Sequence, residues 1–129
     1  MKYPKELKYT KTHEWVRREG GKVTAGITDY AQHEISDVVF VEIPKVGQSA
    51  QREKPISVVE SVKAAFDIYA PVSGKVTKVN TELESDPGRV NHDCYGEGWF
   101  FELEMADERE WQSLMTAEEY ENSLKQEAK

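Results

Sequence analysis

Short runs of hydrophobic residues, bounded by glycine and proline, dominate the first 105 positions of the chain. Residues 14–18 and 22–27 are separated by two consecutive glycines, which are typical of a tight turn between strands. Residues 38–43 are rich in β-branched side chains and end at Pro44, which lacks the backbone N–H that a continuing strand needs. These patterns predict a hairpin followed by a third strand.

Four further segments have the length and composition of strands, namely residues 56–62, 66–70, 72–79 and 99–103. The first two flank Lys63, so we expect this lysine at the tip of a hairpin. By contrast, residues 82–98 contain so many Gly, Pro, Asn and Asp residues that we expect a long loop without regular structure.

Capping signatures predict the helices. Asp29 followed by Gln32 resembles a capping box and predicts a short internal helix with Asp29 as its N-cap. Two more signatures predict helices near the end of the chain, Asp107 with Glu110 and Thr116 with Glu119. Many short strands without a regular alternation of strand and helix indicate a mainly β fold, a sandwich or flattened barrel with peripheral helices.

Composition and charge narrow the class of protein. With 129 residues we expect a single unit over 1–129, with a core at about 7–105 and a helical segment at about 107–126. The formal net charge of −7 opposes binding to nucleic acid or to an anionic membrane. The sequence shows neither a membrane-spanning apolar stretch nor a secretory signal, and Cys94 is its only cysteine. These features predict a protein of a bacterial-type cytoplasm.

Lys63 is the most informative candidate for chemistry. Gly47 precedes it by sixteen residues and Gly74 follows it by eleven, each where we expect a sharp turn. A free lysine has a pKa near 10.4, so its use as a nucleophile at neutral pH would cost roughly 4–5 kcal/mol. Acylation by another enzyme avoids this cost, because the amide is neutral and the side chain becomes a tether. The alternative is a solvated turn lysine without a special role.

The segment Glu60-Ser61-Val62-Lys63-Ala64 resembles the lipoyl-lysine motif of the H-protein family of the glycine cleavage system. Gly47 and Gly74 stand in the register of that motif, and the wider resemblance runs from about Leu7 to Tyr120. Four other segments resemble the family in order and spacing, residues 7–16, 26–32, 69–74 and 95–99. Biotin carriers usually have methionines beside the lysine, where this chain has valine and alanine.

This resemblance implies a fold of the lipoyl/biotinyl-carrier type, the barrel-sandwich hybrid, and a non-enzymatic carrier with lipoate attached covalently to Lys63. Such a carrier would take an aminomethyl group from a pyridoxal-phosphate-dependent glycine decarboxylase to a tetrahydrofolate-dependent aminomethyltransferase. Dihydrolipoyl dehydrogenase would reoxidise the dithiol, and lipoylating enzymes would be further partners. The carrier itself would position and protect the arm, that is, the lysine side chain with its attached lipoyl group.

The resemblance also implies which residues contact the arm, namely Thr12, Glu14 and Asp67, with Ile27 and Ala64 as an apolar wall. Carboxylates at Glu14 and Asp67 would stabilise a protonated amine. Each of the two could equally be a solvated strand residue. Glu60 is a candidate for recognition by a lipoylating enzyme, or else a turn carboxylate without a role.

Some residues depart from the family pattern or suggest other chemistry. Phe66 stands where the family commonly has a small residue, and it is placed to narrow or cover the path of the arm. His13, His33 and His92 are scattered, so we predict no metal site, and Cys94 is expected to be an inert loop thiol.

Three alternatives to this function stay open. The first is a lipoyl carrier or lipoyl donor for another 2-oxoacid dehydrogenase pathway, although the Ala- and Pro-rich linkers of an acyltransferase module are missing from the sequence. The second is an enzyme that uses Glu14, Asp67 or Lys63 directly, for which no pair of nucleophile and base is found. The third is an interaction protein that never carries lipoate.

Overall fold

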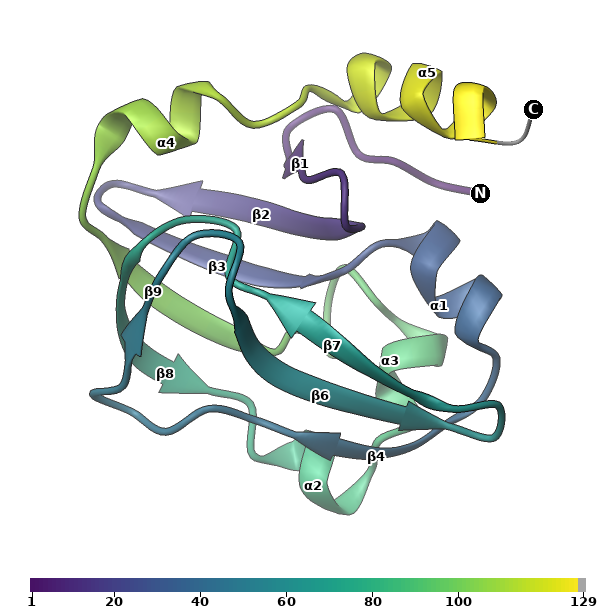
Figure 1. Cartoon of the computed structure of the whole chain (residues 1–129). Helices are drawn as coiled ribbons and strands as arrows, with labels where there is room; N and C mark the ends of the chain where they lie inside the picture. Colours follow the sequence, from purple (N-terminus) through teal and green to yellow (C-terminus); the bar gives the residue numbers. More distant parts are fainter. Residues whose placement is uncertain (128–129) are drawn as a thin grey trace.

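The computed structural model describes residues 1–127, which form two antiparallel sheets surrounded by helices (Figure 1). The larger sheet has the strand order β1-β2-β3-β9-β8-β5, and the smaller has the order β4-β6-β7. The strands of the larger sheet are β1 (Lys8–Tyr9), β2 (Glu14–Glu19), β3 (Lys22–Ile27), β5 (Ser49–Ala50), β8 (Gly74–Val79) and β9 (Phe101–Met105). Those of the smaller sheet are β4 (Val38–Glu42), β6 (Pro55–Ser61) and β7 (Ala65–Tyr69). The prediction of a mainly β, sandwich-like fold is confirmed.

Two of the glycines expected at turns do turn the chain, and a third has a different role. Gly20 has a φ of 62° in the turn of the predicted β2–β3 hairpin, and Gly47 has a φ of 91°. Gly74 is instead the first residue of β8, where an added Cβ would lie 2.0 Å from the backbone oxygen of Glu104 on β9. The turn predicted at Gly74 is therefore wrong, because glycine is required there for close approach of the strands.

The predicted internal helix is α1 (Asp29–Ile35), but its N-cap is Thr28 and not Asp29. The Thr28 hydroxyl accepts a hydrogen bond from the backbone N–H of Ala31 at 3.2 Å. Asp29 lies in the first turn, where its side chain accepts a hydrogen bond from the Gln32 amide at 2.8 Å. Threonine and aspartate are both good N-caps, and for that reason the sequence pattern misplaced the cap by one residue.

Residues 82–98 contain two short helices, so the prediction that this segment lacks regular structure is wrong in part. Each helix is anchored by one aliphatic side chain, Leu83 in α2 (Glu82–Ser85) and Val90 in α3 (Arg89–His92), both 0% exposed. Arg89 adds ion pairs to the carboxylates of Glu82, Asp86 and Glu97. These tertiary contacts override the many turn-forming residues of the segment.

Two helices follow β9, as predicted, α4 (Glu108–Gln112) and α5 (Ala117–Glu127). Thr116 and Glu119 form the expected capping box, with hydrogen bonds of 2.8 and 3.2 Å. Asp107 caps α4, but Glu110 does not complete a second box. Its carboxylate accepts hydrogen bonds from the N–H and hydroxyl of Ser73 at 2.7 and 3.1 Å. Glu110 therefore ties α4 to the segment before β8.

Strand boundaries differ from the predicted ones in a few places. β8 begins at Gly74 and not at Val72, and β9 begins at Phe101 and not at Trp99. β1 and β5 were not predicted, because a strand of two residues has no measurable alternation.

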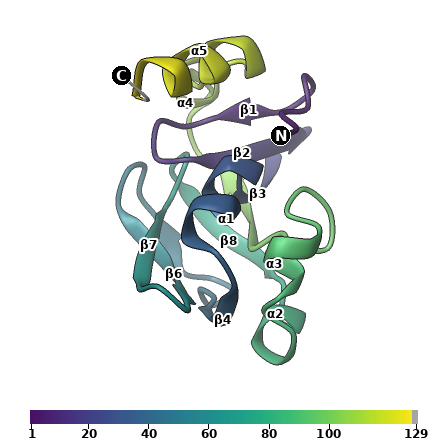
Figure 2. The same ribbon diagram turned by 90° about the vertical axis from the view of Figure 1, so that its right-hand side faces the viewer.

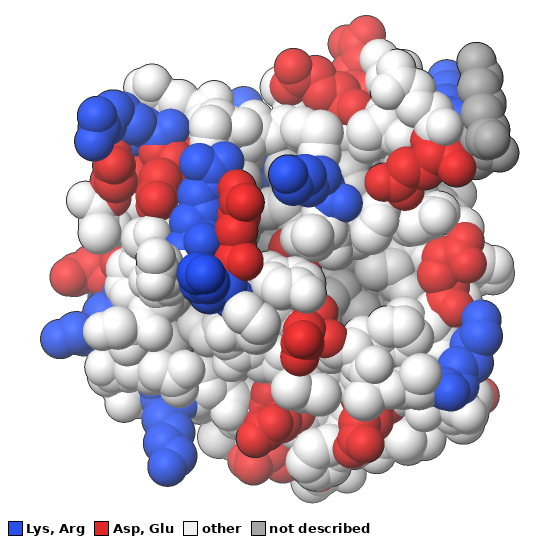
Figure 3. Space-filling view, viewed as in Figure 1, with Lys and Arg blue, Asp and Glu red and all other residues white. Residues whose placement is uncertain are grey.

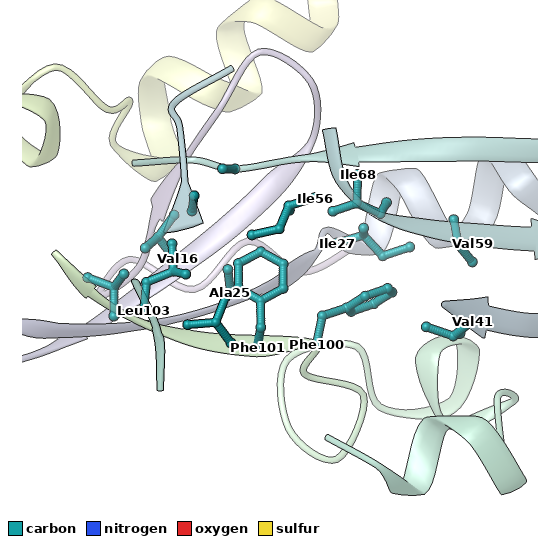
Figure 4. Close-up of a cluster of buried hydrophobic side chains, with 14 of the residues drawn as sticks. Val16, Ala25, Ile27, Val41, Ile56, Val59, Ile68, Phe100, Phe101 and Leu103 are labelled. Atoms are coloured by element: carbon teal, nitrogen blue, oxygen red, sulfur yellow. The ribbon is translucent and has the colours of Figure 1, made fainter. Parts of the chain in front are cut away.

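The two sheets face each other across a hydrophobic core (Figure 4). Side chains from both sheets and from the residue before β9 meet there, among them Val16, Ala25, Ile27, Val41, Ile56, Val59, Ile68, Phe100, Phe101 and Leu103. Each of these is at most 8% exposed. Burial of apolar surface contributes about 25 cal/mol per Å². The core therefore fixes the β6–β7 hairpin relative to β2 and β3.

A second cluster joins the two ends of the described chain. Leu7, Tyr9, Trp15, Ala117 and Tyr120 are all buried and pack together. Figures 1 and 2 show α5 lying beside β1, on the side of the molecule away from the smaller sheet. The C-terminal helix is thus attached to the β1–β2 edge of the larger sheet.

Candidate functional site

Lys63 lies at the exposed tip of the β6–β7 hairpin, where the sequence predicted it. Ser61 shapes the turn, because its N–H donates to the Ala64 oxygen at 2.9 Å and its hydroxyl accepts from the Lys63 N–H at 3.0 Å. The Lys63 Nζ donates a hydrogen bond to the carbonyl oxygen of Glu34 in α1 at 2.9 Å. The lysine is accessible to an enzyme, and its side chain is directed toward α1.

Glu60 and Ala64 are exposed on either side of Lys63. Glu60 is paired with Phe40 on β4 and with Ala65 on β7, and all three residues are exposed. It therefore lies on the outer face of the smaller sheet. Ala64 belongs to the turn and lines neither of the two cavities described next.

A cavity of about 350 Å³ lies beside β7, between the hairpin, α1 and the segment before β2; we call it the hairpin cavity. Its lining is mostly aliphatic and aromatic, formed by Thr12, His13, Ile27, Tyr30, Ala31, Glu34, Ile35, Val59, Phe66, Asp67 and Ile68. Three of the predicted arm contacts, Thr12, Ile27 and Asp67, are thus brought together. Since Glu34 accepts the hydrogen bond of Lys63, the lysine side chain reaches the rim of this cavity.

A second cavity of about 310 Å³ contains Glu14, and we call it the Glu14 cavity. Thr12 lines both cavities, and Ile27 of the hairpin cavity pairs with Glu14 in the β2–β3 ladder. The other lining residues are Tyr9, Thr10, Lys11, Arg52, Glu53, Tyr69, Ala70, Pro71, Ser113, Leu114 and Met115. The two cavities are therefore neighbours that share Thr12.

Glu14 is a buried carboxyl group, only 1% exposed. Burial raises its pKa to about 7, against the lowering effect of hydrogen bonds from Thr10, Thr12 and Tyr69. Oε1 accepts from the two threonine hydroxyls at 2.5 Å each, and Oε2 accepts from the Tyr69 N–H at 3.4 Å. A protonated amine beside this group would favour the carboxylate, because opposite charges stabilise each other in a buried site. Glu14 can therefore bind a cation at neutral pH.

Asp67 differs from Glu14 in its surroundings, since it is exposed on the edge strand β7. Figure 3 shows acidic side chains on this face of the molecule, over the region of β4, β6 and β7. Basic side chains are also present on this face, and Lys11 and Arg52 line the Glu14 cavity. The hairpin cavity is lined by the carboxylates of Glu34 and Asp67, which attract a cation there.

His13 and Phe66 also line the hairpin cavity. The sequence indicated no role for His13. In the structure, Nδ1 of its ring lies 2.8 Å from the hydroxyl of Tyr120, a residue distant in the chain. No local pattern links two residues 107 positions apart. Phe66 is 37% exposed and pairs with the buried Val59, so it forms part of the cavity wall.

Metal-binding groups, membrane-spanning helices and a reactive thiol bear on other functions. Within residues 1–127, no group of three or more His, Cys, Asp or Glu side chains is arranged to hold a metal ion. None of the described helices combines the length and apolar character needed to cross a membrane. Cys94 is buried, and burial raises the pKa of its thiol to about 12, which suppresses the reactive thiolate.

Comparison with known proteins gives one consistent result. The family described as Glycine cleavage H-protein matches residues 7–127. A glycine cleavage system H protein of Rubrobacter xylanophilus is 52% identical over 124 residues, 96% of each chain. One from Thermus thermophilus is 51% identical over 128 residues, 99% of this chain and all of the relative. The crystal structure of a glycine cleavage system H protein from Mycobacterium marinum has a TM-score of 0.84 at 34% identity, and the match covers 95% of this chain and 98% of that one.

Proposed function

The chain belongs to the glycine cleavage H-protein family, and from this premise we propose that Lys63 is the residue that carries the lipoyl group. The protein is a lipoyl carrier of the glycine cleavage system, and a role in another 2-oxoacid dehydrogenase pathway is not favoured. The observation that carries the assignment to Lys63 is its exposed position at the hairpin tip, with Nζ at the rim of the hairpin cavity.

The residues around Lys63 fit a lipoyl group. The attachment reaction needs access to Nζ, and the lysine is exposed in a turn with the small residue Ala64 beside it. An attached acyl chain needs an apolar surface, and Ile27 and Phe66 supply one in the adjoining cavity. When bound, the lipoyl group would supply a disulfide that accepts the aminomethyl group and is reduced as it does so, and that is left as a dithiol once the group is released. This chain supplies the surface on which the arm rests.

The direction of β7 indicates the path of the arm. A strand rises about 3.3 Å per residue, so Asp67 lies roughly 7 Å along β7 from Ala65, the first strand residue after the turn that holds Lys63. Beyond Asp67, the N–H of Tyr69 donates to the buried Glu14 carboxylate. An arm laid along β7 therefore passes the hairpin cavity first and reaches Thr12 and Glu14 afterwards.

In this arrangement the candidate residues have separate tasks. Ile27 excludes water from the arm, Thr12 offers a hydroxyl between the two cavities, and Ala64 leaves the tip open. Glu14 and Asp67 bind the protonated amine, and its charge keeps Glu14 ionised at neutral pH. We assign the bond chemistry of the carried group to the partner enzymes and their cofactors, so the protein acts as a non-catalytic carrier.

The partners follow from this role. The decarboxylase would load the arm, the aminomethyltransferase would unload it, and dihydrolipoyl dehydrogenase would reoxidise it. A lipoylating enzyme would bind the hairpin, with Glu60 as a contact on its outer face. The whole chain would serve as one carrier domain, with residues 7–105 as its core.

Lipoylation in vitro tests the attachment site. The unmodified protein is incubated with lipoate, ATP and a lipoate ligase, and the modified peptide is mapped by mass spectrometry. We expect one lipoyl group on Lys63, none in Lys63→Arg, and normal modification of the control Lys75→Arg, which changes an exposed strand lysine. Slower modification of Glu60→Gln would support its role in recognition. A lipoyl group on another lysine of the wild-type protein would overturn the assignment.

Glycine–bicarbonate exchange by the decarboxylase tests the pathway. We expect the lipoylated wild-type protein to stimulate exchange and Lys63→Arg to be inactive. Stimulation by protein that cannot be lipoylated would contradict the proposed carrier role.

The lifetime of the aminomethyl group on the carrier, without the aminomethyltransferase, tests the arm contacts. We expect Glu14→Gln to shorten the lifetime by about tenfold, because the loss of one buried charge-assisted hydrogen bond has an effect of about this size. Asp67→Asn should have a smaller effect because Asp67 is exposed. Glu104→Gln, at an exposed carboxylate of β9, controls for the change in net charge. Equal lifetimes in Glu14→Gln and this control would refute the role of Glu14.

A further inference from the structure

Tyr120 connects the C-terminal helix to the segment that carries Thr12 and Glu14. The side chain is 0% exposed, and its hydroxyl lies 2.8 Å from Nδ1 of His13 and 2.7 Å from Oγ1 of Thr28. These two partners precede β2 and α1, respectively. One hydroxyl on α5 therefore contacts both of the segments that border the hairpin cavity.

The donor and acceptor capacities of these groups allow two directions for the chain of hydrogen bonds. Oγ1 of Thr28 accepts from the N–H of Ala31 and keeps its own proton and a second lone pair, so it can donate to the Tyr120 oxygen or accept from it. In the first case the Tyr120 hydroxyl donates to Nδ1 of a neutral His13 ring, and in the second it accepts from a protonated Nδ1. Nε2 of His13 lies 3.6 Å from the carboxylate of Glu127.

His13 is held in a backbone conformation that few residues other than glycine adopt, with φ at 73°. Its N–H donates to the oxygen of Thr10 at 3.1 Å, and its oxygen accepts from the N–H of Thr28 at 3.0 Å. The ring lies 4.9 Å from that of Tyr30, in the wall of the hairpin cavity. An unusual backbone conformation persists only where surrounding contacts hold it. The contact with Tyr120 is such a contact.

We propose that Tyr120 is a positioning residue, whose hydroxyl holds the His13 ring and thereby fixes residues 10–14 with the arm contacts Thr12 and Glu14. This inference rests on the proposed docking of the arm. It gives α5 a role in protecting the carried group, although Tyr120 lines neither cavity. The alternative is that Tyr120 only packs, since it also stacks on Tyr9 at a centroid distance of 4.9 Å.

Charged and titratable groups face the His13 ring from two helices. Tyr120 and Glu127 belong to α5, and Tyr30 and Glu34 belong to α1. Burial lowers the pKa of His13, while the two carboxylates act in the opposite direction. The hydrogen bond with Tyr120 favours the protonation state and tautomer of His13 that make it. Removal of the Tyr120 hydroxyl should therefore change the titration of His13.

Tyr120→Phe tests the inference because it removes the hydroxyl and keeps the ring. Tyr3→Phe is the matched control, since Tyr3 packs against Tyr120 at 5.4 Å in the same aromatic cluster but lines neither cavity. The first measurement is an NMR titration of His13 in the unmodified protein. We expect a changed pKa or a changed tautomer of His13 in Tyr120→Phe, and wild-type values in Tyr3→Phe. Identical His13 titrations in all three proteins would overturn the inference without any reference to the arm.

The second measurement is the lifetime of the aminomethyl group on the lipoylated proteins. We expect Tyr120→Phe to shorten it by about fivefold, which corresponds to one lost hydrogen bond, and Tyr3→Phe to leave it unchanged. If the wild type protects the group and Tyr120→Phe protects it equally, only the positioning role is overturned. If the wild type itself gives no protection, the proposed docking fails and this inference fails with it.

The single variant His13→Asn covers the case in which Tyr120→Phe does not fold, and where both variants fold they allow a double-mutant cycle. Asparagine tolerates a positive φ, so His13→Asn breaks the contact from its other side. We expect this variant to shorten the lifetime as well, and the double variant to be no worse than either single variant. Fully additive effects would show that the two residues act independently.

Discussion

The ammonium group of Lys63 donates a hydrogen bond to the carbonyl oxygen of Glu34, 2.9 Å away, although 29 positions separate the two residues. Glu34 lies in the last turn of α1, where backbone oxygens lack partners within the helix and carry partial negative charge. The unmodified lysine therefore rests on the C-terminal end of α1, at the rim of the hairpin cavity.

Acylation of Lys63 should weaken this contact, because an amide has no positive charge to interact with the end of the helix. We expect Lys63→Gln to lower the free energy of unfolding by about 0.5 kcal/mol, and Lys63→Arg to have a smaller effect. Urea denaturation measures both, with Lys78→Gln as a control at an exposed strand lysine. Equal losses in Lys63→Gln and Lys63→Arg would exclude a charge effect.

Glu14 should make the free energy of unfolding depend on pH. Its pKa is about 7 in the folded protein against an ordinary value of 4.5. Above pH 4.5 the unfolded state releases a proton that the folded state still holds, so stability falls as the pH rises to about 7. The full loss is at most about 3 kcal/mol.

The Glu14→Gln variant removes this titration. We expect it to gain stability relative to the wild type as the pH rises from 4.5 to 8, as measured by urea denaturation at several pH values. Glu60→Gln, which changes an exposed carboxylate, controls for net charge. A difference between Glu14→Gln and wild type that stays constant with pH would contradict the raised pKa.

Phe66 should protect the arm rather than block it, because its ring forms part of the cavity wall. We expect Phe66→Ala to shorten the lifetime of the carried aminomethyl group by a few-fold. The loss of stability should be about 1–2 kcal/mol, below that for a fully buried phenylalanine, since the ring is 37% exposed. Val62→Ala is a control at the exposed hairpin tip. A longer lifetime in Phe66→Ala would show that the ring obstructs the arm.

Gly74→Ala should destabilise the fold by at least about 2 kcal/mol, because the new Cβ would lie 2.0 Å from the Glu104 backbone oxygen. Only a backbone shift can relieve this contact. Gly21→Ala is the matched control, since its Cβ would meet no atom within 4 Å, and we expect a change within about 0.5 kcal/mol. Thermal unfolding compares the two, and similar midpoints would refute the steric argument.

Cys94 should react slowly in the folded protein, since the pKa of its buried thiol is about 12. At pH 8 its thiolate fraction is about a thousandfold lower than that of a thiol with the ordinary pKa of 9. We expect iodoacetamide to modify the native protein at least about a hundredfold more slowly than the urea-unfolded protein. Comparable rates would show that the thiol is accessible.

Local patterns were sufficient for most of the strands and helices. The β2–β3 hairpin was predictable because alternating residues flank a glycine turn, and α5 because Thr116 and Glu119 stand three positions apart. The same reasoning missed α2 and α3. These two helices are stabilised by burial of Leu83 and Val90 against elements distant in the chain. Local helix propensity cannot predict such burial.

The sequence by itself determined the hairpin with Lys63 at its tip, because the residues that form it are neighbours in the chain. It also determined the resemblance to one carrier family, because the motifs between Leu7 and Tyr120 keep the order and spacing of that family. Only the tertiary structure decided that Glu14 is buried, that Thr12 lines two cavities, and that the Tyr120 hydroxyl lies beside the His13 ring. Burial raises the pKa of Glu14, and burial depends on which strands and helices pack together. The protection proposed for the arm is therefore a property of the assembled fold.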